Sequence, residues 1–196
     1  AAVVQALTDL DTDPTNFNSV VTGSATAANL ITISAANGTG SINGSGITAV
    51  SGSYSQLMTA DTGALVDISI SGLTSPNITA TDISLTVTQA NLLNGQTSSG
   101  VVTATINEVS ASELAGLSGT GHSYTITVEA GSAAASDLIS VNAVTTIDVN
   151  LENVTGVTGT AANVSSVYAA SGDGFSGLGN IVSTLSGTST ATDITA

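Results

Sequence analysis

The sequence predicts a mainly β fold, a parallel β-solenoid (β-helix) of about seven coils of roughly 27 residues, with short helical turns at the corners. Three observations lead to this prediction: a signature that recurs at regular spacing, short segments in which apolar and polar residues alternate, and an apolar content of 41% with only 3% aromatics. A narrow core needs only small and medium aliphatic side chains, whereas a thick globular core normally contains several large aromatics.

The recurring signature has five residues: a small or hydroxyl residue, two mostly small ones, an Asp, Glu, Asn or Gln, and an aliphatic residue. Its seven copies end at Leu30, Leu57, Ile83, Leu114, Leu138, Val164 and Ile194. Successive ends are 27, 26, 31, 24, 26 and 30 residues apart, a period typical of stacked repeats. The segment 88–92 (TQANL) also fits the signature, so the register of the repeat is not unique there.

The signature itself predicts the start of a helix. Six of the seven copies have Ser or Thr followed three residues later by a carboxyl or amide residue, and Ser110 with Glu113 forms a full capping box. We therefore expect one or two helical turns at each copy, with the closing aliphatic side chain in the interior of the coil.

Strands are expected between the signatures, because residues 65–70, 102–106, 124–128 and 146–151 alternate between apolar and polar types. Their Ile and Val side chains should point inward. An outward stripe should then contain Thr103, Thr105, Thr125, Thr127, Asp148 and Asn150. The glycine-rich segments 37–40, 43–46 and 171–174 are expected to form corners that need positive φ.

The predicted domain organisation has two parts. Residues 1–21 form an N-terminal segment, which caps the repeats or contacts another subunit, and residues 22–196 form the repeat domain. The last signature has only just begun at 190–196, so we expect the repeats to continue into more chain or into the next subunit.

Charge excludes several partners. The chain has no Lys and no Arg, and its 14 acidic residues give a formal net charge of −14. Nucleic acids and anionic membrane surfaces are both recognised through cationic side chains, so neither is an expected partner. The apolar runs are only a few residues long, so no membrane insertion is expected either.

Calcium is the one cofactor that the sequence suggests. Asp9, Asp11 and Asp13 place oxygen ligands at alternate positions, as the first half of a calcium loop does, although Pro14 stands where such a loop needs Gly. Asp173, in a Ser-Gly-Asp-Gly corner, resembles a single calcium-turn element. For both segments the alternative is a solvated turn, loop or helix cap that binds no metal.

Catalysis is not expected. His122 is the only histidine, the chain has no cysteine, and no Gly-x-Ser-x-Gly motif surrounds any serine. Solenoid polysaccharide lyases and hydrolases would be the enzyme alternative. Such lyases generally need a basic residue that this chain lacks, and its carboxylates have no spacing distinctive of a hydrolytic pair.

Several segments resemble the Ala/Ser/Thr-rich, Lys/Arg-poor repeat tracts of large secreted bacterial surface proteins. The resemblance covers about residues 22–196 and is found in the TAANL and SASEL signatures, in 85–92, and in 101–106 leading into 110–114. It implies an extracellular β-solenoid in a surface layer, an adhesin stalk or a filament. Such proteins often contain tandem calcium-binding nonapeptides, and this chain has none.

The function predicted from these observations is that of an extracellular structural protein, secreted or at the cell surface, which self-assembles into a filament, sheath, surface layer or adhesin stalk. The alternative is a binding module that contacts polysaccharide or ice through its outward Thr/Asn/Asp stripe.

Overall fold

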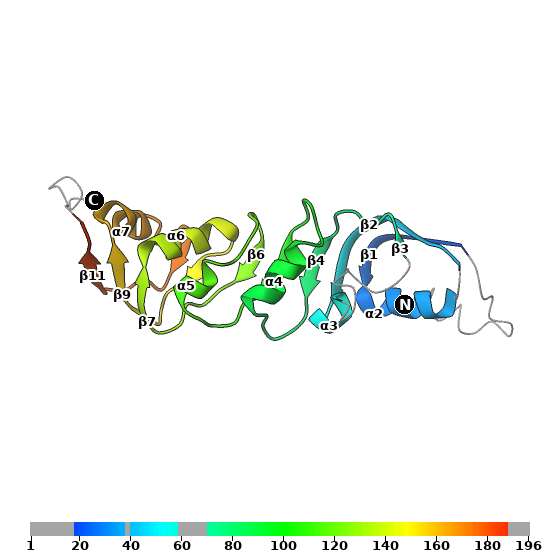
Figure 1. Cartoon of the computed structure of the whole chain (residues 1–196), viewed down its shortest axis with the longest axis horizontal. Helices are drawn as coiled ribbons and strands as arrows, with labels where there is room; N and C mark the ends of the chain where they lie inside the picture. Colours follow the sequence, from blue (N-terminus) through cyan, green and yellow to red (C-terminus); the bar gives the residue numbers. More distant parts are fainter. Residues whose placement is uncertain (1–17, 38–39, 59–69, 188–196) are drawn as a thin grey trace. The chain divides into compact units, whose positions relative to one another are not determined.

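The computed structural model describes residues 18–37, 40–58 and 70–187 (Figure 1). Within these residues the protein is a mixed α/β fold. The strands are β1 (Ser19–Thr26), β2 (Ile42–Gly52), β3 (Ile70–Ser71), β4 (Asn77–Ala80), β5 (Val102–Thr105), β6 (Ser123–Thr125), β7 (Gly131–Ala134), β8 (Val149–Asn150), β9 (Val154–Gly159), β10 (Phe175–Ser176) and β11 (Val182–Leu185). The helices are α2 (Ala27–Asn37), α3 (Tyr54–Leu57), α4 (Val87–Asn94), α5 (Ala111–Leu114), α6 (Ala135–Val144) and α7 (Ala161–Ala169).

The described strands form three sheets. The largest has the order β1-β2-β4-β5-β6 with β3 beside β2, the second has the order β11-β9-β7, and the third is the pair β10-β8. Figure 1 shows β7, β9 and β11 side by side, and α7 contacts β9 and β11. In the parallel ladders, paired residues are 23 to 28 positions apart, as in Ser19 with Ile42 and Ile42 with Ile70. Each ladder therefore joins one sequence repeat to the next.

The chain divides into two compact units. One contains residues 1–83 and 92–103, and the other contains residues 84–91 and 104–196. The buried side chains of the first include Leu30, Ile42, Val50, Leu57 and Ile78. Those of the second include Leu114, Tyr124, Leu138, Val149 and Phe175.

The predicted mainly β solenoid is wrong, because the described residues contain six helices and their strands belong to three separate sheets. Helices α2, α6 and α7 have 11, 10 and 9 residues, which exceeds the one or two turns expected at a corner. These helices are longer than expected because buried apolar residues continue at helical spacing after the signature. In α6, Leu138, Val141 and Val144 follow one another at intervals of three and are all buried, so helical periodicity continues well past the five signature residues.

The signature nevertheless locates most helix starts. Helices α2, α3, α5, α6 and α7 all begin within copies of it, and the closing residues Leu30, Leu57, Leu114, Leu138 and Val164 are buried. The copy at 79–83 is the exception in the described chain. Its Ile83 is 96% exposed, and the helix begins instead at Val87, one residue before the segment 88–92 that made the register ambiguous.

The predicted sidedness of the strands is confirmed over 102–106 and 124–128. Val102, Ala104, Ile106, Tyr124, Ile126 and Val128 are buried, whereas Thr103, Thr105 and Thr125 are exposed. The inward orientation expected for Ile147 is wrong, since this side chain is 40% exposed. The corner predicted at 43–46 is also wrong, because these residues lie within β2 and Gly44 is buried.

Candidate functional site

Strand β11 is the outer strand of its sheet, and all four of its residues are exposed. It pairs with β9 on one side, where Val182 faces Gly156 and the Ser186 N–H donates to the Gly159 carbonyl at 2.8 Å. Because backbone groups alternate in direction along a strand, the N–H groups of Ser183 and Leu185 point away from β9. No other described strand pairs with that side.

Helix α7 holds β11 in place through Tyr168. The Tyr168 hydroxyl donates to the Ile181 carbonyl at 3.3 Å and lies 3.0 Å from Ser183 Oγ. These bonds fix the segment that leads into β11 and the strand itself, so the free edge is held in an extended conformation.

Strand β1 ends the six-stranded sheet in the same way. It pairs with β2, and among the described strands none pairs with its other side. Val20 on β1 is 70% exposed and Val182 on β11 is 72% exposed. Neither strand contains a charged residue or a proline, two of the devices that protect sheet edges from pairing with another chain.

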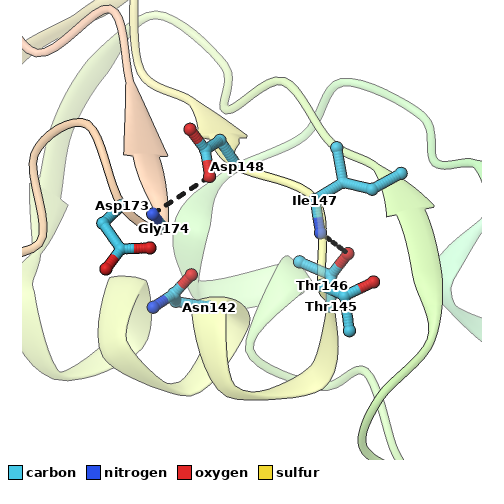
Figure 2. A pocket seen from close by; sticks show the side chains of 7 residues that line it. All are labelled: Asn142, Thr145, Thr146, Ile147, Asp148, Asp173 and Gly174. Carbon is cyan, nitrogen blue, oxygen red and sulfur yellow. Dashed lines mark hydrogen bonds between the residues drawn. The ribbon is translucent and has the colours of Figure 1, made fainter.

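A polar cleft lies elsewhere in the second unit (Figure 2). Its volume is about 230 Å³, and it is lined by Asn142, Thr145, Thr146, Ile147, Asp148, Asp173 and Gly174. The Gly174 N–H donates to Asp148 Oδ1 at 3.0 Å, and the Ile147 N–H donates to Thr145 Oγ1 at 3.2 Å. The cleft therefore presents carboxylate, amide and hydroxyl groups from two consecutive repeats.

The turn that bounds this cleft depends on glycine. Gly172 has φ +86° and Gly174 has φ +121°, so the corner predicted at 171–174 is confirmed. A Cβ at position 174 would lie 2.7 Å from the Asn142 amide nitrogen. A side chain there would thus be strained in the backbone and would push into the cleft.

Of the four predicted calcium ligands, the structure describes only Asp173. Asp9, Asp11 and Asp13 lie outside the described residues. Asp173 is exposed and shares the cleft with Asp148, whose sequence separation of 25 residues is close to one repeat. This separation is the sequence signal from which the proximity of Asp148 and Asp173 could have been predicted. In the part of the chain that the structure describes, no group of three or more His, Cys, Asp or Glu residues could hold a metal ion. Calcium at Asp173 stays a prediction.

His122 is a buried residue of the second unit. Its ring centroid lies 5.0 Å from that of Tyr124, and its backbone N–H donates to the Val144 carbonyl at 3.1 Å. Burial lowers the pKa of the His122 imidazole from its ordinary value of 6.5. Burial also raises the pKa of the Tyr124 hydroxyl to about 12.

Comparisons with known proteins give no relative: no protein-family model, no curated protein and no solved structure matches this chain. The resemblance to repeat tracts of bacterial surface proteins therefore stays a prediction. Among the described residues, no helix has the length and apolar character needed to span a membrane.

Proposed function

We propose that this chain is an extracellular structural protein, a building block of a surface filament, sheath, surface layer or adhesin stalk, which assembles by pairing its edge strands. The observation that supports this most directly is the pair of exposed, uncharged edge strands β1 and β11. Open edges of this kind are templates for adding a strand from another chain, with backbone hydrogen bonds as the main source of affinity.

The composition supports an extracellular role. A chain without Lys or Arg offers no cleavage site to trypsin-like proteases, which is an advantage outside the cell. Short neutral side chains also replace the charged residues that usually keep a surface polar, since charged residues make up only 7% of the chain.

The test compares a lysine introduced on an edge strand with a lysine introduced outside the described strands. We expect wild-type protein to form filaments or sheets visible by electron microscopy, and Val182→Lys to stay small in analytical ultracentrifugation, because a charged edge resists pairing. Ile83→Lys is the matched control, because Ile83 is 96% exposed and lies outside every described strand. Wild-type protein that stays monomeric would contradict the proposed function.

A second candidate function is polysaccharide binding, which the polar cleft favours. Its carboxylate, amide and hydroxyl groups can bind sugar hydroxyls, and the partly exposed Ile147 offers an apolar contact for the ring. An array of neutral and amino-substituted oligosaccharides tests this function. We expect binding to be lost in the double variant Asp148→Asn/Asp173→Asn and retained in Glu129→Gln, which changes an exposed carboxylate outside the cleft. Absence of binding to every member of the array would exclude this candidate.

A further inference from the structure

We propose that the partner of each edge is a second copy of this chain, joined head to tail, with β11 of one copy pairing in parallel with β1 of the next. This inference rests on the proposed function of self-assembly and adds the partner, the two strands and their direction.

Strands β1 and β9 occupy the same position in their repeats. Each runs directly into a helix through the sequence Thr-Ala-Ala-Asn, at 26–29 for β1 and at 160–163 for β9. In each, the Thr hydroxyl accepts a hydrogen bond from the Asn backbone N–H, at 3.1 Å for Asn29 and 3.3 Å for Asn163. The two strands are therefore equivalent elements of the repeat.

The neighbours of β9 show what β1 lacks. Strand β9 has β7 from the preceding repeat on one side and β11 from the following repeat on the other. Strand β1 has its following neighbour, β2, and among the described strands it has no preceding one. Strand β11 has a preceding neighbour, β9, and no described following one. The free side of β11 and the free side of β1 are thus the two complementary sides of one kind of parallel ladder.

Charge favours contact at these strands over other surfaces. Two copies, each with a formal charge of −14 and no cationic side chain, repel one another wherever carboxylates approach. Strands β1 and β11 contain no carboxylate, and each presents one exposed valine, Val20 and Val182, that pairing would bury. Because the joined sides differ, the contact is heterologous, and it uses β11 of one copy and β1 of the other, so the remaining β1 and β11 can pair with further copies.

The test uses the absence of cysteine from the natural chain, so that introduced thiols have no background. Val20→Cys and Val182→Cys protein are mixed and treated with a short bis-maleimide, and the products are analysed by denaturing electrophoresis and mass spectrometry. The equivalence of β1 with β9 places Val182 opposite Thr22 and two residues from Val20. Such diagonal neighbours across a ladder are about 7 to 8 Å apart, within reach of such a reagent. We expect covalent dimers linking position 20 to position 182. A mixture of Val182→Cys with Ile83→Cys measures the linking that results from random collision.

The outcomes separate this inference from the proposed function. Assembly seen by sedimentation with only 20–20 or 182–182 links would overturn the head-to-tail arrangement and leave self-assembly standing. Linking no greater than in the Ile83→Cys control, together with assembly, would also overturn it. Absence of both assembly and linking would overturn the proposed function as well.

A backbone variant tests whether strand pairing, and not mere proximity, brings the two valines together. Leu185→Pro removes an N–H that points away from β9, so the existing ladder with β9 keeps its hydrogen bonds. We expect loss of the 20–182 link when Leu185→Pro is added to Val182→Cys, with the circular dichroism spectrum unchanged. An undiminished link would overturn pairing through β11.

Discussion

His122 is a titratable residue that the fold buries. Its side chain is 3% exposed and stacks at a tilt on Tyr124, itself fully buried. A protonated imidazole would lose its hydration there, which is why the folded state lowers the His122 pKa below 6.5. The folded protein therefore prefers a neutral His122.

This preference makes stability depend on pH in a defined direction. Below pH 6.5 the unfolded chain binds a proton at His122 that the folded protein does not, so the free energy of unfolding falls as pH decreases from 6.5 towards the lower folded pKa. Above pH 7 the contribution is constant. One proton gives a slope of at most about 1.4 kcal/mol per pH unit.

Urea denaturation of wild type and His122→Gln between pH 5 and pH 8 measures the effect. Carboxylates titrate in both proteins, so only the difference between the two pH profiles reports His122. We expect that difference to be flat above pH 7 and to shift in favour of the variant below pH 6.5. Parallel profiles across the whole range would show that His122 is not held neutral by the fold.

At the same scale, the sequence singles out Asp173 as a calcium-turn residue and Asp148 as part of the outward stripe, but it does not join them in one cleft and does not indicate Asn142. Asp173 was selected because it stands in a glycine-rich turn, and the structure confirms that turn through the positive φ of Gly172 and Gly174. Asn142 was not selected, because it lies near the end of α6 and only the packing of the next repeat brings it to Gly174. Contacts between repeats depend on register, which composition and local motifs do not fix.

At the scale of elements, local chemistry predicted where helices begin better than where they end. Two copies of the signature show why the starts are predictable: the Glu113 N–H donates to Ser110 Oγ at 3.3 Å, and the Ser53 N–H donates to Gln56 Oε1 at 3.0 Å. Helix ends depend on how far an apolar face continues to find partners. In α7, Val167 continues the buried face of Ala161 and Val164 beyond the signature, and the helix follows it.

Strands show the same division between local and tertiary information. Alternation gave the buried face of 102–106 and 124–128, because a period of two is a property of the strand itself. It could not give the membership of three separate sheets, or the fact that β8 and β10 are only two residues long. Those features depend on where neighbouring repeats keep a common register, and this dependence is why the predicted solenoid was wrong.

At the scale of the whole molecule, a formal charge of −14 with no compensating cation opposes any association between copies. Salt shortens the range of this repulsion, from about 30 Å at 0.01 M ionic strength to about 10 Å at 0.1 M. The hydrogen bonds of strand pairing between uncharged edges depend much less on ionic strength. We therefore expect assembly to increase with NaCl, in contrast to association driven by opposite charges, which salt weakens.

Calcium can both screen carboxylates and bind them, so its effect on assembly is compared with that of sodium and magnesium. We expect assembly, measured by sedimentation, to increase to the same extent in NaCl, MgCl₂ and CaCl₂ at equal ionic strength if screening alone is needed. A greater increase in CaCl₂, reversed by chelator, would instead show that calcium bridges carboxylates, since calcium accepts irregular sets of oxygen ligands more readily than magnesium does. In that case Asp173→Asn should remove the excess if the predicted site at Asp173 is responsible, and Glu129→Gln should not. Assembly that is greatest in the absence of salt would contradict repulsion between copies as the limiting term, and with it the role proposed for the uncharged edges.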